Sequence, residues 1–234
     1  MMLENYRFKT EMHAHTSPAS SCSEIPAGKM AEIYKNLGYD SLCITNHFTP
    51  AKALAMGKNA FIDGFMKDFN TVFENGKKLG LNVIFGVELR FCENENDYLV
   101  FGVGEGDLEV MFGYLERGIA EFYRDFSRED NLILQAHPFR DGMSRAPIGS
   151  IDGVEAFNVH PGHNSRVSVT AKYAAEHDYL VSCGTDFHHP GHEGQIALRT
   201  TEEVKNSYDL ARIIKSRDYL FSTGNCLILP YANS

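Results

Sequence analysis

Lys9-Thr10-Glu11-Met12-His13-Ala14-His15 is a strand-like run that ends in two histidines just before a turn. Four further runs repeat this design, because each is a short apolar stretch that ends in an imidazole or a carboxylate before a loop. They lie at residues 41–47, 83–88, 132–138 and 180–188. Functional groups of α/β barrels gather at the carboxyl ends of the strands. The repetition therefore predicts an active site on one face of such a barrel.

Strand-like runs alternate with amphipathic helical patterns along the chain. Helices are expected from Ser23 to Gly38, from Phe61 to Gly80, and over 108–126, 165–177 and 202–216. This alternation predicts parallel strands joined by crossover helices. With 234 residues, 43% of them apolar, we expect one barrel-like α/β domain over residues 1–234. Its strands are predicted over roughly 7–13, 41–46, 83–88, 97–102, 132–137, 153–158 and 179–185.

Composition narrows the classes of partner and compartment. The net charge is −9 and the lysines and arginines form no basic block, which argues against extended contact with nucleic acid. No apolar run approaches the length of a membrane span, and the amino terminus does not resemble a signal peptide. The cysteines are odd in number and lack CxxC spacing, so we expect a reducing, cytoplasmic location. They are Cys22, Cys43, Cys92, Cys183 and Cys226. Nothing in the sequence indicates the oligomeric state.

Three loops follow the chemistry-bearing strand ends and are expected to select or enclose a substrate. The first runs from Phe48 to Ala60 and contains two lysines. The second runs from Phe139 to Ser150 and carries Arg140 and Arg145. The third, from Phe187 to Gln195, is rich in histidine, glycine and proline.

The polar residues at the strand ends form a candidate set of metal ligands. His13 and His15 lie on one face of a strand because side chains alternate with period two. Glu88 ends an apolar strand, where an unpaired carboxylate is costly, so it needs a cation partner. Arg90 is the only basic residue close to it in sequence. The set is too large for one ion that keeps an open position, so at least two ions are expected, with Glu88 as the bridge. Nitrogen and oxygen ligands favour zinc, manganese or iron. The candidate ligands are His13, His15, His47, Glu88, His137, Asp186 and His188.

These motifs together resemble the polymerase-and-histidinol-phosphatase family of metal-dependent phosphoesterases. The resemblance rests on His13-x-His15, Thr45-Asn46-His47, Gly86-x-Glu88, Ala136-His137-Pro138, Asn158 and Gly184-Thr185-Asp186-x-His188, which occur in the family's order. It implies a distorted seven-stranded barrel, two or three divalent metal ions, and hydrolysis of a phosphate ester.

The chain departs from the family pattern at three places. Asn46 stands where the family often has aspartate. In the stretch after His15, only Cys22 could supply the further ligand that three-metal members use. The strand over 97–101 lacks the histidine of some members, and His160 and His163 either replace it or line the loop.

We interpret the chain as a phosphatase for a small phosphate monoester, which acts through a metal-bound hydroxide. Asp186 and His160 are the candidate catalytic residues, and Arg140 and Arg166 are the candidates for binding phosphate. Histidinol phosphate, a nucleotide and a sugar phosphate all suit this pocket. One alternative is a metal-dependent amidohydrolase, although such enzymes usually bridge their metals with a lysine at a strand end. The other is a non-catalytic metal-stabilised module of the kind attached to polymerases.

Overall fold

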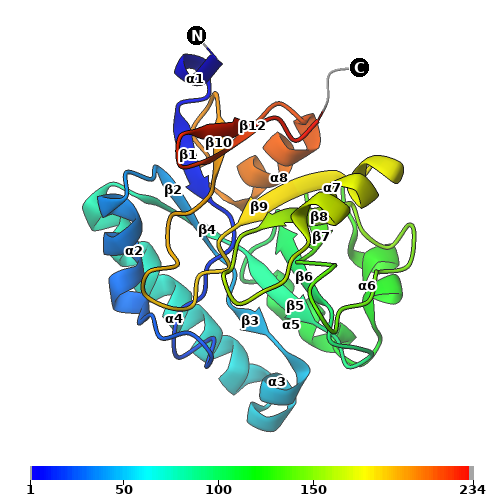
Figure 1. Cartoon of the computed structure of the whole chain (residues 1–234). Helices are drawn as coiled ribbons and strands as arrows, with labels where there is room; N and C mark the ends of the chain where they lie inside the picture. The colour runs from blue at the N-terminus through cyan, green and yellow to red at the C-terminus, as the bar shows by residue number, and fades with distance from the viewer. Residues whose placement is uncertain (1, 232–234) are drawn as a thin grey trace.

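The computed structural model describes residues 2–231, and its strands form two six-stranded sheets (Figure 1). The first sheet has the order β12-β11-β10-β1-β2-β4 and the second β3-β5-β6-β7-β8-β9. The strands of the first sheet are β12 (Cys226–Ile228), β11 (Leu220–Thr223), β10 (Ala197–Thr200), β1 (Phe8–Glu11), β2 (Ser41–Ile44) and β4 (Asn82–Phe85). Those of the second are β3 (His47–Phe48), β5 (Val87–Arg90), β6 (Asp97–Phe101), β7 (Leu132–Gln135), β8 (Gly153–Asn158) and β9 (Leu180–Gly184).

The two sheets meet where the chain passes directly from one to the other. The step from β4 to β5 is made at Gly86, where a Cβ atom would lie only 2.8 Å from the Cys43 sulfur. Elsewhere, the segments after β1 and β9 come together, since Ala14 forms a parallel bridge with Phe187. The amide of His15 donates to the Phe187 carbonyl at 3.1 Å. The histidine-bearing ends of strands from both sheets are therefore brought to one place.

Helices cover the outside of the sheets (Figure 1). The helix predicted from Phe61 to Gly80 is α4 (Lys58–Leu79), which buries Phe61, Phe65, Phe69 and Val72 of its apolar stripe, while Phe73 of the same stripe is partly buried. Each such side chain stabilises the fold by about 1.5–3 kcal/mol when it is fully buried. No helix within residues 2–231 combines the length and apolar character needed to cross a membrane. The helices are α1 (Met2–Asn5), α2 (Ala27–Asn36), α3 (Pro50–Met56), α4 (Lys58–Leu79), α5 (Asp107–Tyr114), α6 (Ile119–Phe126), α7 (Val167–Glu176) and α8 (Ser207–Ser216).

The structure differs from the sequence predictions in several places. The sheets are mixed rather than parallel, because β5 pairs with β6, β6 with β7, and β1 with β10 in antiparallel fashion. The predicted loop over 48–60 contains α3, which begins with Pro50 at a position where proline's fixed φ favours a helix. The single helix predicted over 108–126 is split at Gly118, whose φ is +84°. The mixed α/β class is confirmed, whereas a barrel of seven strands is not confirmed by this pairing.

Candidate metal centre

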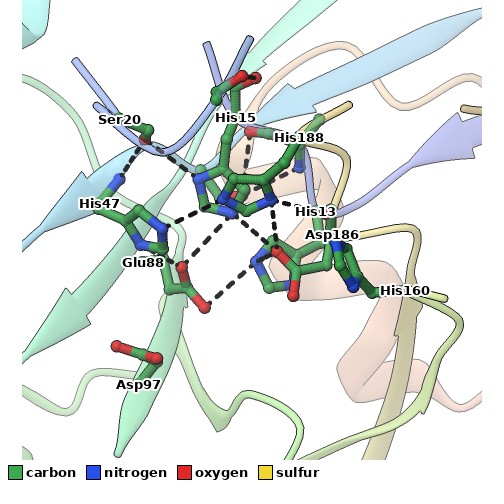
Figure 2. A network of polar contacts seen from close by, with 12 residues as sticks. His13, His15, Ser20, His47, Glu88, Asp97, His160, Asp186 and His188 are labelled. Carbon is green, nitrogen blue, oxygen red and sulfur yellow. Dashed lines mark hydrogen bonds and ion pairs between the residues drawn. The ribbon is translucent and has the colours of Figure 1, made fainter. Parts of the chain in front are cut away.

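The structure brings together all seven predicted ligands, from strand ends far apart in sequence. Figure 2 labels all of them except His137. Glu88, on β5, lies at the centre and is fully buried. Its Oε1 lies 3.3 Å from Nε2 of His13 and 3.2 Å from Nε2 of His137. Its Oε2 lies 3.4 Å from Nε2 of His15 and 2.6 Å from Nδ1 of His47. One carboxylate thus faces four imidazoles, which is the geometry expected of a bridging ligand.

Asp186, which follows β9, supplies a second carboxylate to the same cluster. Its Oδ1 lies 3.4 Å from His13 Nε2, 3.2 Å from His15 Nε2 and 3.3 Å from His188 Nδ1. Its Oδ2 lies 3.0 Å from Nδ1 of His163. His163 is therefore adjacent to the predicted ligands. The sequence alone did not decide whether this histidine lies at the metal cluster or lines the loop.

Surrounding acceptors fix which nitrogen each imidazole turns inward. Nδ1 of His13 lies 2.8 Å from a Glu155 oxygen, so this nitrogen is assigned the proton that it donates. Nδ1 of His188 lies 2.8 Å from the backbone carbonyl of Asp186, and the same assignment follows. Both rings therefore direct Nε2 toward the other predicted ligands. Partners that orient ligand histidines in this way are typical of metal sites.

Ser20 orients His15 by the same principle. The hydroxyl of Ser20 donates to Oδ1 of Asn46 at 2.9 Å, so its oxygen is left to accept. It accepts from the His47 amide at 2.9 Å and lies 3.2 Å from Nδ1 of His15. His15 is thus assigned the Nδ1 proton and turns a bare Nε2 toward the carboxylates. Asn46 takes part as a partner of this loop, in the position where the resemblance led us to expect aspartate.

Several nitrogen and oxygen atoms of the cluster that could bind a metal are buried without any hydrogen-bond partner. They are Nε2 of His13, Nε2 of His15, Nδ1 of His47 and Oε2 of Glu88. Carboxylate oxygens lie nearby, but none is placed to form a hydrogen bond. Leaving buried polar atoms unsatisfied costs about 1–3 kcal/mol each, more for charged groups. Lone pairs of nitrogen and oxygen that converge in this way fit divalent cations.

Four overlapping groups of donor atoms could each hold an ion, since the atoms of each group lie within 4.8 Å of one another. The groups share His15, Glu88 and His137, and the sequence prediction of at least two ions stays a prediction. The groups are His15, His47 and His188; His13, His15 and Glu88; His137, His163 and Asp186; and Glu88, Asp97 and His137.

The charges in the cluster are strongly coupled. Burial alone would raise the pKa of Glu88, but His47 and His13 hold it well below its ordinary value. Burial alone would lower the pKa of His13, but Glu155, Asp186 and Glu88 raise it well above its ordinary value. Burial lowers the pKa of His15 well below its ordinary value, and His188 and His47 lower it further. The two central carboxylates therefore stay ionised. Despite burial, Glu88 also raises the pKa values of His47 and His137, and Asp186 raises that of His188.

The backbone around the cluster adopts conformations that are unfavourable elsewhere. His137 and Asp186 have φ values of +29° and +51°, which residues other than glycine rarely adopt. Strain of this kind is typical of functional sites. Position 184 requires glycine because two side chains lie too close for any other residue. A Cβ atom there would lie 2.4 Å from Cβ of His13 and 2.7 Å from Glu155 Oε1.

Sequence reasoning missed two buried carboxylates behind the ligands. Glu155 holds His13, as described, and its other oxygen accepts from the His137 amide at 3.1 Å. Glu11 accepts from the amides of Met12, His13 and Thr185 at 3.0–3.1 Å. It therefore ties the first histidine motif to the last one. The sequence contained a hint of them, because both carboxylates lie inside predicted strands, where a buried carboxylate needs a hydrogen-bonding or charged partner.

A cavity of about 360 Å³ opens over the cluster. Arg140 lines it, as does His160, whose pKa burial and His163 lower to about 4. Arg166 is not among the lining residues. Its guanidinium instead donates to the Phe139 carbonyl and pairs with Asp141, both at 2.6 Å. The lining residues are Cys22, His47, Thr49, Arg90, Asp97, His137, Arg140, His160, His163, Asp186, His188 and His189.

Cys22 lies at this cavity, beside two of the predicted ligands. Partial burial raises the pKa of its thiol, but hydrogen bonds with His188 and His47 lower it to about 6. A thiolate would therefore be present at neutral pH, which is the form that binds metal. Cys22 does not belong to any of the four tight donor groups, so its part in a third ion site stays a prediction.

Comparisons with known proteins agree with this geometry. The family model for the PHP domain matches residues 11–222. A search of curated proteins finds no match. A two-domain protein from Bacteroides vulgatus, described as containing a predicted PHP-like metal-dependent phosphoesterase, superposes with a TM-score of 0.67. It is 13% identical, and the match covers 94% of this chain and 66% of that one.

Two further solved structures share the fold. PsfC from Pseudomonas syringae is 14% identical with a TM-score of 0.59, and the match covers 87% of each chain. An amidohydrolase from Chromobacterium violaceum, solved with bound sulfate and no metal, is 12% identical with a TM-score of 0.55. That match covers 95% of this chain and 98% of the other. At these identities the likeness concerns the fold alone.

Proposed function

This chain belongs to the PHP domain family, and from that premise we propose that it is a metal-dependent phosphoesterase that hydrolyses a small phosphate monoester. The observation that carries the proposal is the set of buried nitrogen and oxygen atoms without hydrogen-bond partners around Glu88. Two or three divalent ions of zinc, manganese or iron would satisfy these atoms. Bound ions of this kind supply Lewis acidity toward phosphoryl oxygens and lower the pKa of a coordinated water.

The ligands would divide between overlapping sites. Glu88 belongs to two of the four donor groups and Asp186 reaches both sides of the cluster, so these carboxylates would bridge. The imidazoles of His13 and His15 would contribute Nε2, since their other nitrogens are already held. The remaining ligands would be His47, His137 and His188, with Cys22 as a candidate for a third ion.

His160 is suited to act on the substrate rather than on the metals. Its pKa of about 4 keeps the imidazole neutral at pH 7. Nδ1 accepts from the Gly162 amide at 3.0 Å, so Nε2 carries the proton. His160 would therefore offer a neutral N–H donor to an oxygen of the substrate. Asp186 would hold its negative charge among the histidines throughout.

The two predicted arginines would have different parts in substrate binding. Arg140 lines the cavity and would bind a phosphoryl oxygen directly. Arg166 lies behind it and bonds the backbone carbonyl of Phe139, the residue before Arg140. We propose that Arg166 acts mainly by holding this loop.

The cavity chemistry limits the substrate. Among the described residues, those that line it carry no large apolar side chain. A small and polar phosphate ester suits such walls better than one with a bulky hydrophobic group.

We also propose that the two sheets together form a distorted seven-stranded barrel and that the protein is cytoplasmic. The odd number of cysteines and the lack of CxxC spacing support this location.

The second candidate is a metal-dependent amidohydrolase, favoured by the fold shared with the Chromobacterium violaceum protein. The described residues that line the cavity include no lysine, which such enzymes would use as a bridge.

The test is hydrolysis by purified protein loaded with manganese or zinc, using p-nitrophenyl phosphate, a panel of phosphorylated metabolites and a panel of amides. Phosphate release with no amide cleavage supports the proposal. Amide cleavage without phosphate release would replace it with the second candidate.

A further inference from the structure

Arg90 is a second arginine of the cavity wall, besides Arg140. It follows Glu88 by two residues on β5, so both side chains project from the same face of the strand. Glu88 points into the metal cluster, and Arg90 lines the cavity above it with 25% of its side chain exposed. The sequence suggested Arg90 as the cation partner of Glu88, but its direct partners in the structure are other carboxylates.

Asp97 holds Arg90 in one orientation. The antiparallel pairing of β5 with β6 places Arg90 opposite Asp97. Nε donates to Oδ1 at 2.7 Å and Nη2 donates to Oδ2 at 2.8 Å, and the Asp97 side chain is only 1% exposed. These two parallel bonds occupy one edge of the guanidinium and fix its plane. The edge formed by Nη1 and the second hydrogen of Nη2 is left for another acceptor.

Glu95 is the acceptor that Nη1 has in this structure. Its side chain is 75% exposed, in contrast to that of Asp97. Ion pairs with exposed carboxylates contribute little, because water and salt compete with them. An anion that enters the cavity can therefore displace Glu95, while Asp97 keeps the guanidinium in place.

Asp97 also belongs to a possible metal group with Glu88 and His137. Its Oδ2 lies 3.9 Å from Nε2 of His137, farther than the other carboxylate contacts of that histidine with Glu88 and Asp186. Both of its oxygens already accept hydrogen bonds from Arg90. These contacts indicate that Asp97 positions Arg90 rather than binding a metal ion.

We propose, on the basis of the phosphoesterase function above, that Arg90 is a specificity-determining residue that binds phosphoryl oxygens of the substrate through its free edge. Asp97 is its positioning residue, and Glu95 is the carboxylate that the substrate displaces. Arg90 and Arg140, the two arginines of the cavity wall, then contact the anion together.

The experiment measures binding of inorganic phosphate to the manganese-loaded protein by calorimetry, with hydrolysis of p-nitrophenyl phosphate and metal content measured in parallel. Arg90→Ala should weaken phosphate binding roughly ten- to a hundredfold and raise KM more than it lowers kcat. Arg90→Lys should restore only part of the affinity, because a lysine cannot bind both Asp97 and phosphate as a planar fork. Added guanidinium at non-denaturing concentrations should partly rescue Arg90→Ala.

Glu95→Gln guards against a folding defect in Arg90→Ala, because it changes an exposed side chain. Removal of the competing carboxylate should tighten phosphate binding by up to about fivefold. Arg117→Ala is the matched control, since Arg117 is an exposed arginine paired with Glu121 outside the cavity. It should leave phosphate binding unchanged.

The inference is overturned if Arg90→Ala binds phosphate as the unchanged protein does, if it loses metal, or if Glu95→Gln weakens binding. It is also overturned if the unchanged protein does not bind phosphate. Failure of the proposed function gives a different result. Phosphate binding that depends on Arg90, without hydrolysis of any phosphate ester, would retain the anion site and reject the enzyme activity.

Discussion

Replacement of Glu155 by glutamine perturbs the metal centre without touching a proposed ligand. In the structure, Oε1 of Glu155 accepts from His13 Nδ1 at 2.8 Å. Oε2 accepts from the His137 amide at 3.1 Å and from the Asn158 side-chain amide at 3.0 Å. Both oxygens therefore face donors only. Glutamine must place its NH₂ group against one side or the other.

The less costly choice is to turn the NH₂ group toward His13, because the His137 backbone amide on the other side cannot reverse. The Asn158 amide could flip only by giving up the bonds that its oxygen accepts from the His160 amide and Ser165. His13 must then accept at Nδ1 and move its proton to Nε2, which is the nitrogen that would bind metal. Loss of a partner that orients a ligand histidine typically costs 10- to 100-fold in metal affinity. That corresponds to roughly 1.4–2.7 kcal/mol. We expect Glu155→Gln to weaken metal binding by this amount.

The same change should alter the pH dependence of metal binding. Glu155 is the strongest of the charges that raise the pKa of His13. Metal binding requires His13 with a single proton, so affinity falls as the pH drops below this raised pKa. In Glu155→Gln the pKa of His13 is lower, and the fall in affinity should shift to lower pH.

Affinity can be measured by competition with a chelator over a range of pH, with nitrogen chemical shifts of His13 reporting its tautomer. Glu74→Gln is the control, because Glu74 is exposed on α4 and pairs with Lys77 of the same helix. Unchanged metal affinity and an unchanged His13 tautomer in Glu155→Gln would refute this account of how the cluster is oriented.

Two further predictions concern substrate binding and stability. Arg140→Ala and Arg166→Ala should leave metal content unchanged, and loss of a charge-assisted contact, about 1.5–3 kcal/mol, should lower kcat/KM roughly ten- to over a hundredfold in Arg140→Ala. We expect a smaller effect in Arg166→Ala, and normal turnover by both variants would show that other groups hold the phosphate. Glu11→Ala should lower the free energy of unfolding by about 3 kcal/mol or more in urea titrations, because three buried amides lose their acceptor. Glu11→Gln should be milder, since the hydroxyls of Thr185 and Tyr34 that donate to Oε2 can turn and accept instead, and equal effects of both variants would contradict this explanation.

Much of the fold could be read from the sequence because its signals are local. Apolar runs such as 132–135 and 153–158 are strands where they were predicted. Strand direction could not be read in this way, because an antiparallel neighbour such as β10 is chosen by pairing across the chain. Helix α3 was missed because its seven residues are too few for a clear amphipathic period.

The candidate site shows the same division. Ligand histidines at strand ends were recognisable because several motifs repeated one pattern. The partners Glu155 and Ser20 were not, because their role depends on which nitrogen of a distant ring they face. Arg90 was considered only as a neighbour of Glu88, since nothing in the sequence shows that Asp97 lies opposite it.

The central claim is that the buried donor cluster holds at least two divalent ions. Native mass spectrometry of the purified chain, stripped of metal and titrated with zinc or manganese, counts the ions directly. We predict at least two per chain, and fewer in Glu88→Gln, because a neutral amide is a poor bridge between cations. One ion or none in the unchanged protein, or full occupancy in Glu88→Gln, would contradict the account.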